Sequence, residues 1–253
     1  MGLGLGVGVL ADLRANDADG YAERLEQFAA VNEALHAAGL PAHHEPYDLG
    51  GREPWFGSIG GYGALHDLRR IAAYLWGGYG LPEPDTERPY HDYGALHHLR
   101  RIAAHVRAGH SLPPPNPERP SHDPIMDACY ARSFSDASPY RAEHLIFHCD
   151  AEGLYLPLAF RAVIEPPEEL SIVGGPLGSS YTLLEECQRI ATVLALPLDR
   201  ALVWEGEADW TPPTASRGDS APWRMYLTAA RTCGLLYNAC RVSIAMGCAI
   251  TFG

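Results

Sequence analysis

The middle of the chain contains the same segment twice. Residues 62–92 and 93–123 align without a gap and are identical at 20 of 31 positions. Stacked repeats need at least about three copies to bury a continuous core, so two copies do not make a solenoid. The duplication instead indicates that one helix and the loop after it were copied within an existing domain.

Each copy predicts an amphipathic helix followed by a proline-rich linker. Apolar residues recur with the spacing of one buried helix face, at Leu65, Leu68, Ala72 and Leu75 and again at Leu96, Leu99, Ala103 and Val106. Glycines end both helices, and a Leu-Pro pair begins each linker. We expect both helices to pack on the core of the domain.

Outside the repeat, segments typical of strands and helices alternate. Strands are expected at residues 3–10, 42–47, 144–149, 154–160, 170–173 and 248–252, and helices at 19–40, 181–196 and 223–242. Segments 144–149 and 154–160 would pair as a hairpin around residues 150–153. The pattern predicts an α+β (mixed α/β) fold: a single domain over residues 1–253, with a short central sheet packed by helices.

The basic residues of the chain are all arginine. It contains 19 arginines and no lysine. This composition excludes every mechanism that needs a lysine amine, including Schiff-base aldolases, pyridoxal-phosphate enzymes, Walker-A phosphate binding and protein kinases.

Negative charge is concentrated at the two ends of the chain. The net charge is -12, with nine acids against three arginines over residues 1–60, seven against seven over 61–123, and fifteen against nine over 124–253. Such a surface repels phosphate backbones, so we expect no nucleic-acid partner. It would attract a basic protein partner, and the alternative is that the charge serves solubility alone.

The chain shows no sign of export or membrane insertion. Its N-terminus lacks a basic region before the first apolar run, and no apolar stretch is long enough to span a bilayer. A cytoplasmic location and no membrane partner are therefore expected. The six cysteines form no C-x-x-C pair, which favours small buried side chains over a metal site or a disulfide framework.

One polar cluster could support catalysis. His148, Asp150 and Glu152 would project to the same face of a strand, because side chains alternate with a period of two. A histidine flanked by carboxylates suits general acid–base catalysis or a divalent metal. The alternative, which we favour, is an ordinary turn ending at Gly153. No particular metal or cofactor is indicated.

Two further places could hold an anion. A glycine-rich loop leads through Gly178 into a helix that starts near Ser179 and Ser180, where free N–H groups favour a phosphate or carboxylate. The alternative is a simple serine cap. Arg70 and Arg101 each follow a histidine by four residues on one helix face and could hold an anion too, although solvated helix surface is the favoured interpretation.

Three motifs resemble an uncharacterised actinobacterial protein family. They are Gly-Tyr-x-x-Leu-His-x-Leu-Arg-Arg-Ile-Ala-Ala at residues 61–73, His-Leu-Ile-Phe-His-Cys-Asp-Ala-Glu-Gly-Leu-Tyr-Leu-Pro at 144–157, and Gly-Ser-Ser-x-x-Leu-Leu-Glu-Glu-Cys at 178–187. The resemblance implies no established activity and assigns no site residue.

Two functional hypotheses remain. The favoured one is an acidic binding protein, similar in manner to immunity or inhibitor proteins, that recognises a basic protein partner. The alternative is a small-molecule hydrolase, with or without a metal, that uses His148, Asp150 and Glu152. The sequence does not indicate an oligomeric state.

Overall fold

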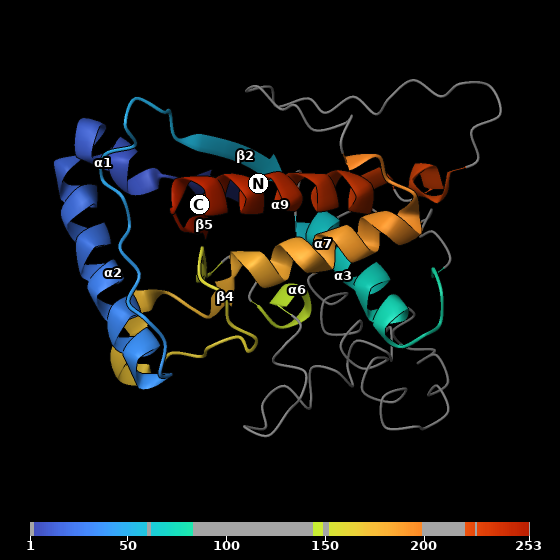
Figure 1. Cartoon of the computed structure of the whole chain (residues 1–253), viewed down its shortest axis with the longest axis horizontal. Coiled ribbons are helices and arrows are strands. Elements are labelled where there is room, and N and C mark those ends of the chain that lie inside the picture. Colours follow the sequence, from blue (N-terminus) through green and yellow to red (C-terminus); the bar gives the residue numbers. More distant parts are fainter. Residues whose placement is uncertain are drawn as a thin grey trace.

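The structure is a computed structural model that describes residues 3–59, 62–82, 144–148, 152–198, 221–225 and 227–252. In chain order the elements are β1 (Leu3–Val7), α1 (Val9–Asn16), α2 (Ala18–Ala37), β2 (Trp55–Ile59), α3 (Tyr62–Trp76), α6 (His144–Phe147), β3 (Leu154–Leu156), the 3-10 helix η2 (Glu168–Val173), β4 (Leu177–Ser179), α7 (Ser180–Leu194), the 3-10 helix η3 (Pro222–Met225), α9 (Leu227–Met246) and β5 (Ile250–Phe252). Figure 1 shows their arrangement.

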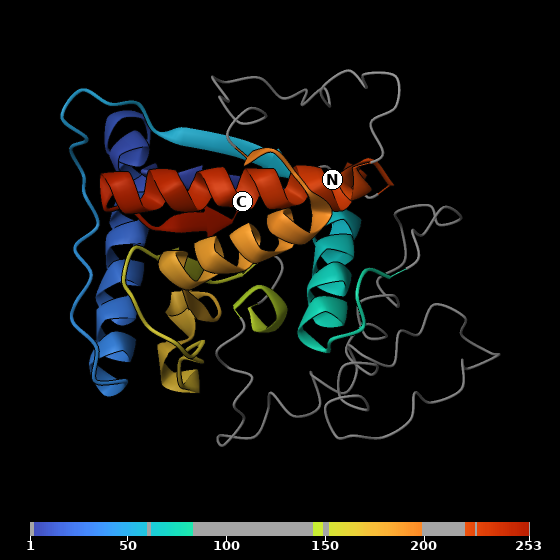
Figure 2. The same ribbon diagram turned by 45° about the vertical axis from the view of Figure 1, so that its right-hand side comes forward.

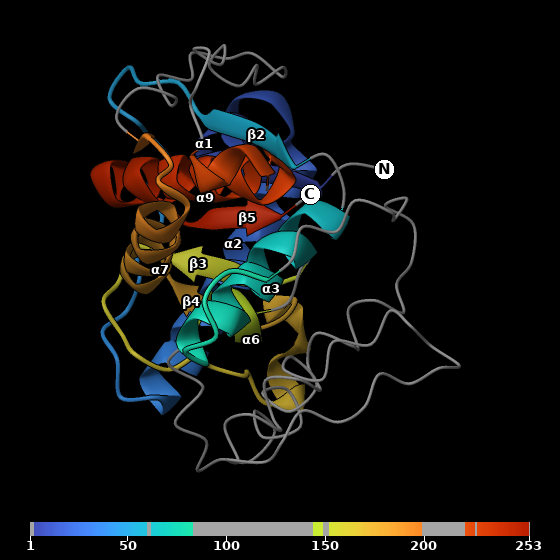
Figure 3. The ribbon, with the colours of Figure 1, turned by 90° about the vertical axis from the view of Figure 1, so that its right-hand side faces the viewer.

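The five strands form one mixed sheet in the order β2-β1-β5-β3-β4. Strand β1 pairs antiparallel with both β2 and β5, so the first and last strands of the chain lie side by side. Strand β3 pairs antiparallel with β5 and parallel with β4. The stacked arrows of β5, β3 and β4 are visible in Figure 3.

The sheet separates two apolar clusters. Tyr155 of β3 belongs to a cluster built mainly from α3, α6, α7 and α9, while its neighbours Leu154 and Leu156 belong to a second cluster with α2 and η2. Alternate strand residues point to opposite faces, so these two helical groups cover opposite faces of the sheet. Figure 2 shows α7 running beside α9 and η2 beside the lower part of α2.

The α+β fold class is confirmed by the five-stranded sheet and its helices. The assignment of residues 1–253 to a single domain stays a prediction. The second repeat copy, at residues 93–123, lies outside the described residues.

The first repeat copy forms the expected helix. In α3, Leu65, Leu68 and Ala72 are buried, as their spacing predicted, and Leu75 packs against the same cluster. The helix ends before Gly78, which has a φ of 78°. The helices predicted at 19–40, 181–196 and 223–242 are confirmed with shifted ends as α2, α7, and η3 with α9.

The hairpin predicted from residues 144–149 and 154–160 is wrong. Residues 144–147 form the short helix α6, and only 154–156 form a strand. The run His-Leu-Ile-Phe suits a buried strand equally well by composition, and contacts from distant helices select the helical form. The premise that placed His148, Asp150 and Glu152 on one strand face therefore fails.

Three other strand predictions also need correction. Residues 168–173 form η2 rather than a strand, residues 42–47 form no regular element, and β1 ends at Val7 because Gly8 turns the chain with a φ of 80°. Strand β2 was missed: a glycine and a serine interrupt its apolar pattern, and pairing with β1 defines it. Among the described helices, none is long and apolar enough to cross a membrane.

Candidate functional site

Helix α2 presents a row of carboxylates to solvent. Asp19, Glu23, Glu26 and Glu33 are all exposed. At ~100° per residue, these four positions fall within ~80° of arc and extend over ~21 Å of helix. The helix is anchored at its start by Asp17, whose side chain caps it by accepting the Gly20 N–H at 3.0 Å.

The neighbouring element η2 adds two more exposed carboxylates, Glu168 and Glu169. The two elements are joined by a hydrogen bond of 2.7 Å from Gln27 Nε2 to the carbonyl oxygen of Val173. We call the six carboxylates the acidic face, comprising Asp19, Glu23, Glu26, Glu33, Glu168 and Glu169.

No arginine among the described residues forms an ion pair with a carboxylate of the acidic face. None of the six forms an ion pair with any residue that the structure describes. Arg24 lies ~140° around the helix from Asp19, where it donates to Gln27 Oε1 at 2.5 Å. Arg14 is engaged with the ring of Tyr47, 4.6 Å from its centroid. The local charge of this surface therefore stays negative.

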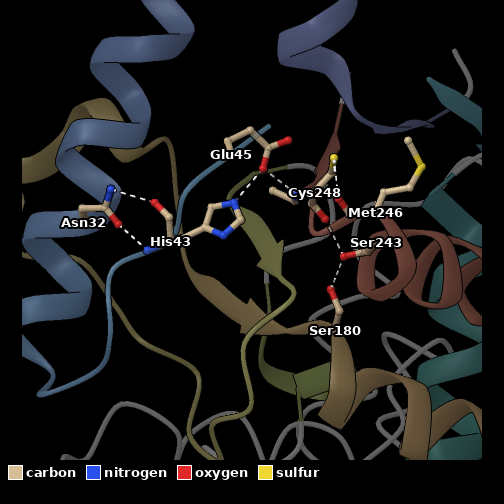
Figure 4. A network of polar contacts seen from close by, with 8 residues as sticks. Asn32, His43, Glu45, Ser180, Ser243, Met246 and Cys248 are labelled. Carbon is tan, nitrogen blue, oxygen red and sulfur yellow. Dashed lines mark hydrogen bonds and ion pairs between the residues drawn. The ribbon is translucent and has the colours of Figure 1, made fainter. Parts of the chain in front are cut away.

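A buried network attaches α2 to the end of the chain (Figure 4). The Asn32 side chain holds the backbone of His43 through two hydrogen bonds, of 2.7 and 2.9 Å. His43 Nε2 contacts Glu45 Oε2 at 2.6 Å, and the same oxygen accepts the Ala249 N–H at 2.7 Å. The carboxylate of Glu45 therefore joins the loop after α2 to the start of β5.

The second branch of this network lies between α7 and α9. The Ser180 hydroxyl bonds that of Ser243 at 2.8 Å, and Ser243 donates to the carbonyl oxygen of Cys248 at 2.6 Å. Burial raises the pKa of the Cys248 thiol to about 12, with the Glu45 carboxylate adding to the shift. Cys248 is therefore a neutral packing residue, and the described Cys187, Cys233 and Cys240 are likewise buried and free, as the sequence predicted.

Helix α6 is capped at both ends by buried charges. Glu186 of α7 accepts the N–H groups of His144 and Leu145 at 2.8 and 2.7 Å. Arg69 of α3 donates to the carbonyl oxygens of Leu145, at 2.5 Å, and His148. An anion at the N-terminus and a cation at the C-terminus complement the helix dipole. These contacts explain why residues 144–147 are helical.

His144 is held as a neutral ring. The Ser179 N–H donates to Nδ1 at 2.8 Å, so the ring proton lies on Nε2, which donates to the Arg161 carbonyl at 3.1 Å. The pKa of His144 is lowered to about 4, chiefly by burial; the hydrogen bond to the Arg161 carbonyl opposes this shift, and the electrostatic effect of His148 adds to it.

Of the three predicted catalytic residues, the structure describes one buried side chain, His148, and one exposed side chain, Glu152. His148 is 1% exposed; its Nε2 lies 3.1 Å from the Leu154 carbonyl, and its ring stacks on Tyr155 with 4.0 Å between centroids. Glu152 is exposed, and Asp150 lies outside the described residues. Their catalytic role stays a prediction.

The predicted anion-binding residues are engaged within the fold. Ser179 caps α7 by accepting the Thr182 N–H and donates to the Leu158 carbonyl, and Ser180 is equally buried. At Gly178, an added Cβ would lie 2.4 Å from the Tyr155 ring, so the glycine permits close packing. Arg70 lies over the Tyr74 ring, and Arg101 is outside the described residues. Binding of an anion by these residues stays a prediction, while the alternative serine cap is confirmed.

An open groove on the described surface lies away from these residues. It has a volume of about 530 Å³ and runs along α7, lined by Arg161, Thr182, Glu185, Gln188, Arg189 and Thr192. It contains none of the predicted catalytic residues. Among the residues with known placement, no three histidine, cysteine or acidic side chains gather to hold a metal ion.

The sequence revealed the surplus of acids near the N-terminus but not their arrangement. The signal that could have found the acidic face is the spacing of Asp19, Glu23 and Glu26, which are four and three residues apart within an expected helix. Glu168 and Glu169 could not be added, because their segment leads into a stretch that was predicted to be a strand.

A comparison with family models identifies one match. The model described as "Putative DNA-mimic protein" matches residues 1–92 and 81–252 of the chain. The two matched segments overlap at residues 81–92, inside the duplicated region. No curated protein and no solved structure matches the chain.

This match corrects the sequence-based prediction about nucleic acid. The expectation that nucleic acid plays no part is wrong, because the family description makes DNA the molecule that is imitated. Repulsion of phosphates, which motivated that expectation, is a property that any imitation of phosphates shares. The resemblance to an uncharacterised family is confirmed, and its actinobacterial origin stays a prediction.

Proposed function

This chain belongs to the family described as "Putative DNA-mimic protein", and we propose that it binds the DNA-contacting surface of a DNA-binding protein through the acidic face. The basic partner expected from the charge then becomes a protein whose basic surface normally contacts phosphates. Occupying that surface would keep the partner from DNA, in the manner of an inhibitor.

The single observation that supports this function is the row of exposed carboxylates on α2, none of which forms an ion pair with a described residue. Four charges over ~21 Å give one per ~7 Å, about half the linear density of one DNA strand, which carries one charge per ~3.4 Å. Counting Glu168 and Glu169 of the adjoining η2 over the same length gives one charge per ~4 Å, which approaches the spacing of a single strand.

The fold also holds these charges in place before any partner arrives. Helix α2 is capped by Asp17 and packed through Phe28, Val31 and Leu35. The network of Asn32, His43 and Glu45 then attaches the following loop to β5. A charge row on a rigid helix loses little conformational freedom on binding, which favours affinity.

The test is capture followed by competition. The immobilised chain is incubated with a lysate of its source organism, and bound protein is eluted with a short DNA duplex. We expect elution at moderate duplex concentration, and we expect the eluted protein to bind the same duplex when purified. Raising the salt concentration should weaken the complex steeply, because binding of the partner to the acidic face, like its binding to DNA, depends on the release of counterions.

A matched elution with dextran sulfate separates imitation of DNA from general attraction of a polyanion. The proposal requires release by duplex at a lower charge concentration than by dextran sulfate. It is overturned if the captured protein has no affinity for DNA, or if duplex does not release it.

A further inference from the structure

Helix α3 occupies its place in the core through a specific set of residues. Six of its side chains are buried to 3% exposure or less, namely Leu65, Leu68, Arg69, Ile71, Ala72 and Ala73. Arg69 adds polar specificity, because its guanidinium holds the carbonyl oxygens of Leu145 and His148 at the end of α6. A different helix would need both the apolar stripe and this arginine to fit the same place.

The second repeat copy has all six residues. With an offset of 31, the counterparts are Leu96, Leu99, Arg100, Ile102, Ala103 and Ala104, and each is identical to the residue that it would replace. Within the helix, one difference is Asp67, which corresponds to His98. The other three fall at its half-buried end, where Tyr74, Leu75 and Trp76 correspond to His105, Val106 and Arg107. The buried side of the site therefore does not distinguish the two copies.

We propose that the docking site of α3 accepts either copy, so that residues 93–107 can replace residues 62–76 within the same molecule. The occupant is thus a segment of this chain rather than a foreign partner. The inference is independent of the proposed function, because it concerns the face of the sheet opposite to α2.

Two observations explain why the first copy is the one seen in the site. The Trp76 ring lies 4.8 Å from the guanidinium carbon of Arg189, and in the exchanged state Arg107 would place a second positive charge there. In addition, only residues 60 and 61 separate β2 from α3. Docking of the second copy would replace this short connection by a loop of more than thirty residues, which costs entropy.

The test uses three full-length variants: Leu68→Asp, Leu99→Asp and the double variant. A charged side chain cannot enter the buried stripe, so Leu68→Asp excludes the first copy and Leu99→Asp excludes the second. We expect Leu99→Asp alone to leave stability unchanged, and Leu68→Asp to lower the folding equilibrium constant by roughly a hundredfold while the chain still folds. The double variant should not fold.

Urea unfolding measures these effects, and hydrogen exchange identifies the docked segment. In Leu68→Asp, amides of residues 93–107 should gain protection while those of 62–76 lose it. Leu183→Asp is the matched control, because Leu183 is fully buried on α7, outside the duplicated segment. It should prevent folding whichever residue is present at position 99.

The proposal is tested by whether the effect of Leu99→Asp on stability depends on the residue at position 68. If Leu99→Asp has no effect in the Leu68→Asp background, or if Leu68→Asp alone prevents folding, the site does not accept the second copy. Folding of Leu68→Asp only as a concentration-dependent dimer would also contradict the proposal, since the exchange would then occur between molecules.

Discussion

The acidic face and the surroundings of α6 use charge in opposite ways. On α2 and η2, six carboxylates are exposed and have no ion-pair partner among the described residues. Around α6, the charges of Glu186 and Arg69 are buried to 1% and 2% exposure and are engaged with backbone groups. The acidic face leaves its charges available to another molecule, while the charges around α6 stabilise the local helical conformation.

This difference predicts where substitutions affect folding and where they affect binding. A buried charge that satisfies backbone groups cannot be removed without leaving those groups unpaired. An exposed carboxylate can be neutralised with little effect on the fold. The two regions should therefore respond oppositely in stability and in partner binding.

The largest expected effect on stability is at Glu186. Leucine at this position would leave the N–H groups of His144 and Leu145 buried without an acceptor, and should cost about 3–5 kcal/mol of unfolding free energy. The neighbouring Glu185→Gln, on the exposed side of α7, should change stability by less than about 0.5 kcal/mol. Urea unfolding of both variants checks this, and equal losses would contradict the distinction.

Acidification should weaken the α6 region through His144. Its folded pKa of about 4 lies below the ordinary value, so the unfolded chain binds the extra proton between about pH 6.5 and 4. The contribution is complete above that window and is lost as the pH falls through it, by about 3 kcal/mol. His144→Gln should show a shallower decline in chemical denaturation between pH 7 and 4. An unchanged slope would mean that this ring does not titrate as described.

A smaller effect is expected for the hydrogen bonds that join α7 to α9. Ser243→Ala removes the bonds to Ser180 and to the Cys248 carbonyl, and should destabilise the protein by about 1–2 kcal/mol. Thr192→Ala is the control, because its hydroxyl bonds only a carbonyl of its own helix at an exposed position. Thermal unfolding should separate the two variants clearly.

The smallest expected effect on stability belongs to the acidic face itself. The triple variant Glu23→Gln, Glu26→Gln and Glu33→Gln should be as stable as the natural chain, or more stable by up to about 0.5 kcal/mol, because repulsion along α2 is relieved. Any gain should shrink as salt screens the charges. A marked loss in urea unfolding would show that these carboxylates have partners that support the fold.

Elements with a strong local signal were predictable from the sequence. Helices α3 and α7 have regular apolar spacing, a glycine after the first and a capping serine before the second. Helix α6 was not predictable, because its caps come from Arg69 and Glu186, which are distant in the sequence. Strand β2 depends in the same way on its pairing with β1.

The candidate site was predictable only in part. Counting acids located the surplus over residues 1–60, which includes Asp19 and Glu23. The count could not show that Arg24 turns away from them or that η2 packs beside α2. His148 was predicted to be catalytic because acidic residues follow it in the sequence. Its burial beside Tyr155 depends on the three-dimensional packing, which the sequence did not reveal.

The central claim is that the acidic face replaces DNA on a basic protein surface. The most direct measurement is displacement of a fluorescently labelled duplex from the captured partner, followed by anisotropy. The test compares the α2 triple variant with a control that loses the same charge elsewhere, through Asp48→Asn, Glu53→Gln and Glu185→Gln. We expect the control variant to displace the duplex at the same concentration as the natural chain. The triple variant should need a concentration roughly 10- to 100-fold higher. Equal weakening of both variants, or of neither, would contradict it.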